Sequence, residues 1–181
     1  MLYKTRCCFS TIVFLFMAAT IGMWGQEASS AGAREQHKAV GEASQPASFS
    51  ELSSQALSAM REHAIKIGIK GVALVAYFDG ADIQSWESKM IVVGKRKDPP
   101  TANAAGANLL AIAYAKAAEA ADSLKPSGSA GRPLLTGEYG WSGSVIRKTR
   151  NGYWIAAFSG GKSEDDVEVS KAGLDSIVKT E

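Results

Sequence analysis

Hydrophobic and polar positions follow distinct patterns along the chain, and each pattern predicts one kind of element. From residue 48 to 68, apolar residues recur every three or four positions, which predicts an amphipathic helix. Ser48 and Glu51 form an S-x-x-E capping box at its start, and Gly68 supplies a stop. The inward stripe is expected to contain Leu52, Ala56, Ala59, His63 and Ile67.

Apolar runs rich in β-formers come next and predict strands. Residues 72–78 form a near-continuous run of this kind, and Asp79-Gly80 after it favours a tight turn. Further strand material is expected at residues 83–86 and 90–93, with an interruption between them.

An alanine-rich segment at residues 101–123 predicts a long helix. One of its faces is expected to pack continuously, with the positions Leu110, Tyr114, Ala117, Ala121 and Leu124. Ala111, Ala115 and Ala118 form a second, small-residue ridge, which suits either internal packing or a contact with the sheet or another subunit.

The C-terminal stretch predicts a hairpin, a glycine elbow and a helix. Asn151-Gly152 favours the positive φ angles of a type I′ turn, so residues 144–149 should pair with residues 153–158. Gly160-Gly161 ends the second strand. The following helix is expected to begin with Ser163 and Asp166 as a carboxylate variant of the capping box, and its stripe is marked by Val167, Ser170, Leu174 and Ile177.

The order of elements is therefore helix, strands, long helix, loop, hairpin and helix. Strands joined by tight turns, with helices at the ends and in the middle, indicate an antiparallel sheet with helices packed on it. The sequence thus predicts a single α+β domain at residues 48–181.

The residues before this domain predict export. Two positive charges followed by the apolar run 7–24 indicate a signal peptide at residues 1–31, with cleavage after Gly25 or after Ala31. An uncleaved N-terminal anchor is the alternative. Residues 32–47 are small and polar, which predicts a flexible linker. The expected location is periplasmic or secreted.

Charge and cysteine content narrow the function. Removing residues 1–31 takes away Lys4, Arg6 and Glu27, so the 20 basic and 18 acidic residues become 18 and 17. A nearly neutral chain has no electrostatic footprint for nucleic acid and no basis for stable membrane association after cleavage. Both cysteines lie in the removed segment, which excludes disulfides, thiolate metal sites and cysteine nucleophiles.

Two segments carry a family resemblance. The run AAFSGGKSEDDVEVSKAGLDSI at residues 156–177 resembles the closing motif of the GlcG/HbpS-like (DUF336) haem-binding or haem-degrading domains, and IAYAKAAEA at residues 112–120 resembles their helix with a Lys-Ala pair. The resemblance implies a profilin-like sheet with helices, and haem or a related tetrapyrrole as the candidate ligand. It also implies cofactor contacts at the matching positions Lys116, Ser159, Gly160 and Gly161.

Aromatic residues beside the glycine-rich loop are further binding candidates. Tyr139 and Trp141 suit the wall of a pocket for a flat ligand and an oligomer interface equally well. His63 is expected to be a neutral, hydrogen-bonded histidine at the edge of the core, with ligation of haem iron as the alternative.

No catalytic residue and no metal site are assigned. Ser159 and Lys162 match S-x-x-K, but two glycines between them prevent the helical turn that this chemistry needs. The acids Glu164, Asp165 and Asp166 are expected to offset the positive end of a helix dipole.

These observations predict an exported, homo-oligomeric protein that binds a small molecule. A haem-degrading enzyme and a non-catalytic structural oligomeric module are the alternatives.

Overall fold

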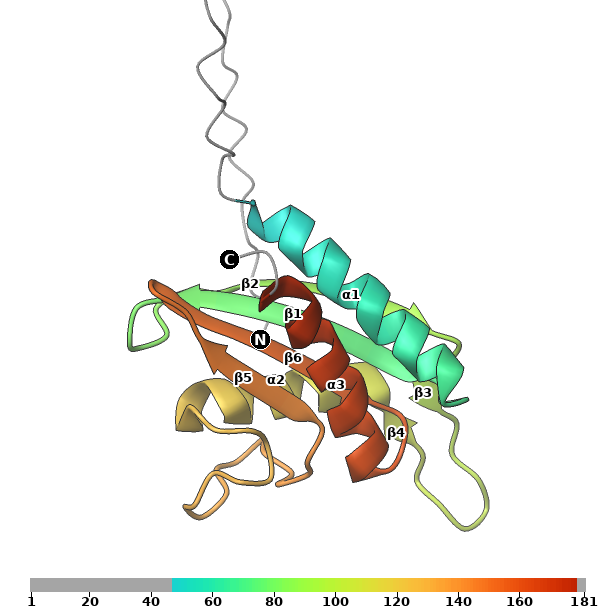
Figure 1. Cartoon of the computed structure of the whole chain (residues 1–181). Helices are drawn as coiled ribbons and strands as arrows, with labels where there is room; N and C mark the ends of the chain where they lie inside the picture. Colours follow the sequence, from blue (N-terminus) through green and yellow to red (C-terminus); the bar gives the residue numbers. More distant parts are fainter. Residues whose placement is uncertain (1–46, 179–181) are drawn as a thin grey trace, which may run out of the picture. The chain divides into compact units, whose positions relative to one another are not determined.

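The protein is described by a computed structural model at residues 47–178, so the predicted signal peptide and all but the last residue of the predicted linker lie outside the described part. Four strands form one antiparallel sheet in the order β2-β1-β6-β5 (Figure 1). The elements are α1 (Phe49–Lys66), β1 (Gly71–Asp79), β2 (Glu87–Val93), β3 (Lys97–Asp98), β4 (Ala107–Asn108), α2 (Leu109–Ser123), β5 (Ser144–Lys148), β6 (Gly152–Ser159) and α3 (Ser163–Val178). The short strands β3 and β4 pair with each other.

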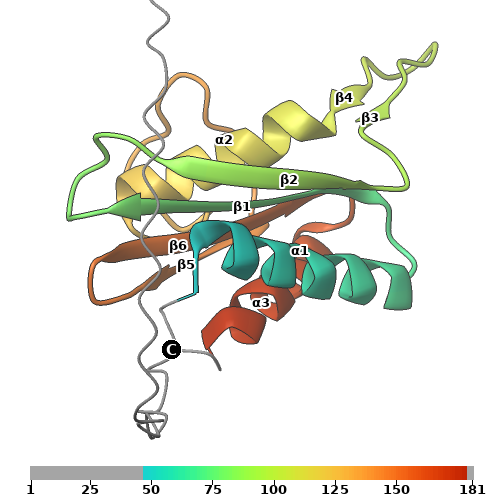
Figure 2. The same cartoon turned by 90° about the horizontal axis from the view of Figure 1, so that it is seen from above.

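The described elements form three layers, with α1 and α3 on one face of the sheet and α2 on the other (Figure 2). Alternation along the central strands produces the two faces, because successive side chains of a strand point to opposite sides. In β1, Ala73 and Val75 pack with α1 and α3, whereas Leu74 and Ala76 pack with α2. The α+β class predicted from the sequence is confirmed.

The first helix begins as predicted, but its buried face is rotated. Ser48 and Glu51 form the capping box, with the Ser48 amide 2.8 Å from Oε2 of Glu51. Ala59 and His63 are only half-buried, and the buried positions are Leu52, Ser53, Ala56, Leu57, Met60 and Ala64. The rotation follows from packing against α3 as well as the sheet: a Cβ on Gly173 would lie 2.6 Å from Cγ of Met60, so the two helices touch where α3 has no side chain.

Two predicted elements have different bounds in the structure. Strand β2 begins at Glu87 and runs without a break to Val93, so the residues expected to interrupt it are part of the strand. Residues 83–86, which were expected to be strand, belong to no strand. As an edge strand with exposed positions, β2 accepts the polar residues that suggested a break. Helix α2 starts at Leu109 and not at residue 101, because Asn108 caps it by accepting a hydrogen bond from the Ala111 amide at 3.2 Å.

The packing face of α2 is also shifted from the prediction. Leu110 and Tyr114 are half-buried, and Leu124 lies exposed beyond the helix end in a left-handed conformation. Ala111 and Ala118 of the small-residue ridge are exposed, so internal packing is the wrong interpretation for these two. The buried apolar residues of the helix are Leu109, Ile112, Ala113, Ala117, Ala120 and Ala121.

The C-terminal hairpin forms from the two predicted strands, but its register is shifted and its turn is not of type I′. Lys148 lies opposite Tyr153 and Ile146 opposite Ile155, whereas a two-residue turn at Asn151-Gly152 would place Arg150 opposite Tyr153. Neither Asn151 nor Gly152 has a positive φ. Glycine is required at 152 for another reason: a Cβ there would lie 2.0 Å from the carbonyl oxygen of Phe78. The predicted glycine elbow between β6 and α3 is present, with Gly160 at a φ of 151°.

Within residues 47–178, no helix is both long and apolar enough to cross a bilayer.

Candidate functional site

An ion pair buried between α2 and α3 joins two of the segments that the sequence analysis singled out. Nζ of Lys116 lies 2.7 Å from Oδ2 of Asp166 and 3.0 Å from the carbonyl oxygen of Phe158. The Lys116 and Asp166 side chains are 5% and 3% exposed. Asp166 therefore does more than offset a helix dipole, since its carboxylate joins α3 to the opposite layer of the domain.

The glycine elbow completes this cluster. The Gly161 amide donates to Oδ1 of Asp166 at 2.8 Å, so the carboxylate binds both the elbow and Lys116. Burial raises the pKa of the Asp166 carboxyl above its ordinary value, while the hydrogen bond and charge of Lys116 and the Gly161 and Gly160 amides oppose that shift. The start of β5 also closes on the cluster, because a Cβ on Gly143 would lie 2.4 Å from Nζ of Lys116.

Four of the six predicted cofactor contacts belong to this cluster or border it. Ser159 is buried and pairs with Val72 of β1. A Cβ on Gly160 would lie 2.1 Å from the carbonyl oxygen of Lys70, so the elbow packs directly on the beginning of β1. The geometry gives Lys116, Gly160 and Gly161 a stabilising role inside the domain, and their contact with a ligand stays a prediction.

The other two predicted contacts, Tyr139 and Trp141, lie on the surface. Their rings stack with centroids 4.9 Å apart, and the residues are 47% and 50% exposed. The loop that carries them is fixed by Arg132, which binds Oε1 of Glu138 at 2.7 Å and also pairs with Asp122. The hydrogen bonding of Arg132 to Glu138, together with a hydrogen bond from the Leu135 amide, lowers the pKa of Glu138 to about 2.

His63 lies at the edge of the core, on the side of α1 that faces α3. Its side chain is 28% exposed, and its Nε2 atom is 3.6 Å from Oε2 of Glu168. That distance is too long for a hydrogen bond. Within the described residues Nε2 is buried and has no hydrogen-bond partner, so the expected edge position is found without the expected hydrogen bond at this atom.

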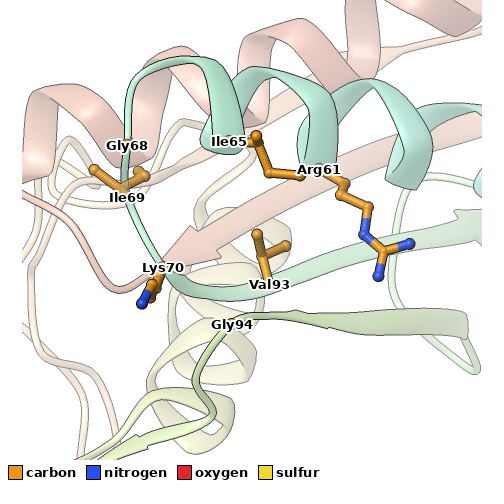
Figure 3. Close-up of a pocket in the computed structure, with 7 residues that line it drawn as sticks. All are labelled: Arg61, Ile65, Gly68, Ile69, Lys70, Val93 and Gly94. Carbon is orange, nitrogen blue, oxygen red and sulfur yellow. The ribbon is translucent and has the colours of Figure 1, made fainter.

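A cavity of about 350 Å³ lies where α1 ends above the paired strands β1 and β2 (Figure 3). Three aliphatic side chains and two cationic side chains line it together with two glycines: Ile65, Ile69, Val93, Arg61, Lys70, Gly68 and Gly94. The volume is at the small end of the range for small-molecule sites, about 300 to 1,000 Å³.

The end of α1 builds this cavity through a Schellman motif. The Gly68 amide donates to the carbonyl of Ile65 at 3.1 Å, and the Ile69 amide donates to that of Ala64 at 3.0 Å. Gly68 has a φ of 75°, which reverses the chain and brings Ile69 and Lys70 beneath the helix end. A Cβ on Gly94 would lie 2.8 Å from Cγ of Lys70, so the stem of Lys70 lies across this glycine.

The cavity suits part of a haem molecule. Its aliphatic side chains match an apolar ring, and Arg61 and Lys70 match propionate groups. Haem iron is held by histidine, cysteine, methionine or tyrosine, and none of the seven lining residues in the described chain is of these types. His63 is not among them. The residues at this cavity therefore do not fit ligation of haem iron.

Within residues 47–178, no three carboxylate, histidine or cysteine side chains are placed to hold a metal ion.

The sequence pattern did not indicate a role for Arg61 or Lys70, or a cavity between them. The part of the site that the sequence could have indicated is the segment IGIKG at residues 67–71. In it Gly68 predicts the end of the helix, and Lys70 is a cation two residues further on. The residues of β2 that complete the wall are distant in sequence. The antiparallel pairing of β1 with β2, in which Gly71 lies opposite Val93, brings them together.

Three solved structures resemble this fold. The PduOC–haem complex has a TM-score of 0.50 at 14% identity, and the match covers 72% of this chain and 94% of that one. A double mutant of HbpS from Streptomyces reticuli has a TM-score of 0.54 at 18% identity, with coverages of 83% and 97%. Protein ORFY of Klebsiella pneumoniae, a DUF336 protein, has a TM-score of 0.46 at 15% identity, with coverages of 72% and 90%.

No family model matches the sequence, and no curated protein matches it significantly. At identities this low, the first two structural matches establish the fold and nothing further. The chain is an α+β domain with a GlcG/HbpS-like fold, as the resemblance of residues 156–177 implied.

Proposed function

We propose that this chain is an exported protein that binds a small molecule, with haem or a related tetrapyrrole as the candidate ligand. The observation that carries the proposal is the cavity at the end of α1, where aliphatic side chains lie between Arg61 and Lys70. Ligand sites in proteins are typically concave and mostly apolar, with a few polar groups that orient the ligand. This cavity has both properties.

The structural neighbours suggest the identity of the ligand. PduOC was solved in complex with haem, and it shares the fold of this chain. Haem combines an apolar ring with two propionates, which matches the chemistry of the cavity lining. We expect haem to be held by packing and by its propionates, because the described lining offers no donor to the iron.

A spectral titration of the mature protein with haemin tests the proposal. Binding is expected to shift the Soret band with a saturable dependence on protein concentration. His63→Ala is expected to leave the spectrum of the complex unchanged, because His63 does not line the cavity. A titration without any Soret shift would remove haem as the ligand, and a shift lost in His63→Ala would move the site to the interface of α1 and α3.

A haem-degrading enzyme is the alternative, and a non-catalytic structural module is the third candidate. An enzyme consumes haem when a reductant is supplied, whereas a binder keeps the Soret band over the same time. A structural module gives neither a shift nor consumption. The spectrum recorded before and after addition of the reductant therefore separates the three.

We also propose that the protein is a homo-oligomer. Four of its large exposed apolar residues belong to one loop, namely Leu134, Leu135, Tyr139 and Trp141. Clusters of this kind are typical of interaction surfaces. Sedimentation of the mature chain tests this point, and a monomer at all concentrations would contradict it.

A further inference from the structure

The side chains of Arg61 and Lys70 are cations without a counter-charge in the described structure. Both side chains are exposed, and no ion pair or hydrogen bond engages either of them within residues 47–178. The lining residues in this part of the chain also include no carboxylate. Two positive charges beside one cavity therefore have no internal neutralising group.

The surface between these cations is apolar. Val93 is buried and points into the space beneath α1, with Arg61 and Lys70 on opposite sides of it in Figure 3. Ile65 also belongs to the lining, and at 64% it has the largest exposed fraction among the large apolar residues in the described part of the chain. An apolar group seated here would contact Val93 and cover the exposed surface of Ile65, and each Å² of apolar surface removed from water stabilises such a complex by about 25 cal/mol.

The positions of the glycines keep the cavity open. No atom lies within 4 Å of where a Cβ on Gly68 would stand, so the helix end leaves free space beside Ile69. Gly94 has a φ of 76° and no side chain, which leaves room for the stem of Lys70. The aliphatic part of the Lys70 side chain therefore packs on Gly94. Arg61 belongs to the last two turns of α1.

We propose that this cavity binds an amphipathic organic anion, meaning an apolar body that carries a carboxylate, with the positive charges of Arg61 and Lys70, one on each side of the apolar surface, attracting the carboxylate. The inference rests on the proposed small-molecule-binding function and adds the ligand class and the residues that select it. Iron plays no part in the recognition. Haem belongs to this class through its propionates, and so do simple aliphatic carboxylates.

Octanoate is the probe, because it has an apolar chain and one carboxylate and lacks a metal. Binding is followed by NMR on methyl-labelled mature protein. We expect the methyl signals of Ile65, Ile69 and Val93 to shift saturably. Octanol, with the same chain and no charge, should bind more weakly, and octylammonium should bind least. A higher salt concentration should weaken octanoate binding, because exposed charges are screened.

The variants Arg61→Gln and Lys70→Gln test the assignment of the two cations. Each is expected to weaken octanoate binding by about fivefold, the upper range for an exposed ion pair, while octanol binding stays the same. Arg150→Gln is the matched control, since Arg150 is exposed in the hairpin turn at the other end of β1. Ile65→Glu places a negative charge at the exposed part of the lining and should abolish octanoate binding.

Equal binding of octanoate and octanol, or equal loss in Arg61→Gln and Arg150→Gln, would overturn the proposal. So would the absence of any octanoate binding. The haemin titration is independent of these results: a Soret shift that survives Arg61→Gln and Lys70→Gln leaves the small-molecule function standing and places its site elsewhere.

Discussion

Lys116 and Asp166 form an ion pair that water reaches at neither end. Removing one partner of such a pair leaves an unpaired buried charge, which costs about 3 to 5 kcal/mol. We therefore expect Lys116→Met to lower the free energy of unfolding by about that amount, measured by urea denaturation.

The double variant Lys116→Met/Asp166→Asn is the control. In the native protein the Gly161 amide donates to Oδ1 of Asp166. The double variant removes both charges and keeps a side-chain oxygen, that of the asparagine amide, as acceptor for this hydrogen bond. Most of the lost stability should return. A double variant as unstable as Lys116→Met would show that shape, and not the unpaired carboxylate, is responsible.

The loss of stability in the single variant Lys116→Met should depend on pH in a defined direction. Burial raises the pKa of Asp166 and Lys116 opposes the rise, so removing Lys116 should raise this pKa further. A carboxyl whose pKa is raised in the folded state contributes to the stability of the folded protein at low pH. That contribution is lost as the pH rises through the folded-state pKa. The destabilisation by Lys116→Met should thus be full at neutral pH and shrink on acidification.

Gly152 faces the backbone of β1 at a distance that no side chain tolerates. A Cβ would lie 2.0 Å from the Phe78 carbonyl oxygen, so Gly152→Val should lower the free energy of unfolding by roughly 1 kcal/mol or more. Asn151→Ala is the matched control, because Asn151 is exposed and its φ is not positive. A thermal melt separates the two, and equal melting temperatures would contradict this account of the hairpin.

At the residue scale, the sequence identified Lys116 and the glycine elbow but not what they do. The Lys-Ala pair and the Ser-Gly-Gly turn can be recognised in the sequence as short motifs. The ion pair cannot, because it joins residues 50 positions apart. Acids at a helix start have an adequate local explanation in the helix dipole. Nothing in the local pattern indicates that Asp166 turns inward while Glu164 stays exposed.

At the scale of elements, ion pairs help to hold the loop between α2 and β5. Arg132 binds Glu138, and that interaction lowers the pKa of Glu138 to about 2. A carboxyl with a depressed folded-state pKa contributes stability above its unfolded value, here 4.5, and loses it as the pH falls toward about 2. Acidification through this window should therefore loosen the loop.

The NMR signal of the Trp141 indole reports this change. It should move between pH 4.5 and pH 2 in the native protein, and Glu138→Gln should show the moved signal already at neutral pH. Glu164→Gln removes an exposed carboxylate from α3 and serves as control. An indole signal that is the same in Glu138→Gln and in the native protein would show that the aromatic stack forms without the Arg132 clasp.

Elements with strong local signals were predicted best. The capping box of α1 and the strand expected at residues 72–78, found as Gly71–Asp79, follow from short-range patterns and are confirmed. The hairpin was also expected, but its register differs from the one that a turn at Asn151-Gly152 predicts. Errors arose where an element depends on its neighbours. The polar positions of β2 suggest a break only to a reader who does not know that it is an edge strand, and alanine content alone placed the start of α2 eight residues too early.

At the scale of the molecule, the α+β class follows from the order of elements, but the layering does not. Both central strands are buried on both faces, and this burial requires helices on both sides of the sheet. The sequence shows the two-sided burial as near-continuous apolar runs. It does not show that α1 and α3 share one face, which depends on the contact of Gly173 with Met60.

Export is a prediction about the whole chain, and it concerns residues outside the described part. Lys4 and Arg6 precede an apolar run that is too weakly flanked for a confident membrane span, so we expect residues 1–31 to direct secretion and to be removed. Expression of the full chain followed by N-terminal sequencing of the exported protein should find a start at Gln26 or Gly32. Replacing both Lys4 and Arg6 by Glu should block processing, because the positive start of a signal peptide is needed for its orientation. Lys38→Glu, in the predicted linker, should leave processing unchanged. An intact cytoplasmic chain that still begins with Met1 would contradict the prediction, and an intact membrane-bound chain would favour the uncleaved anchor.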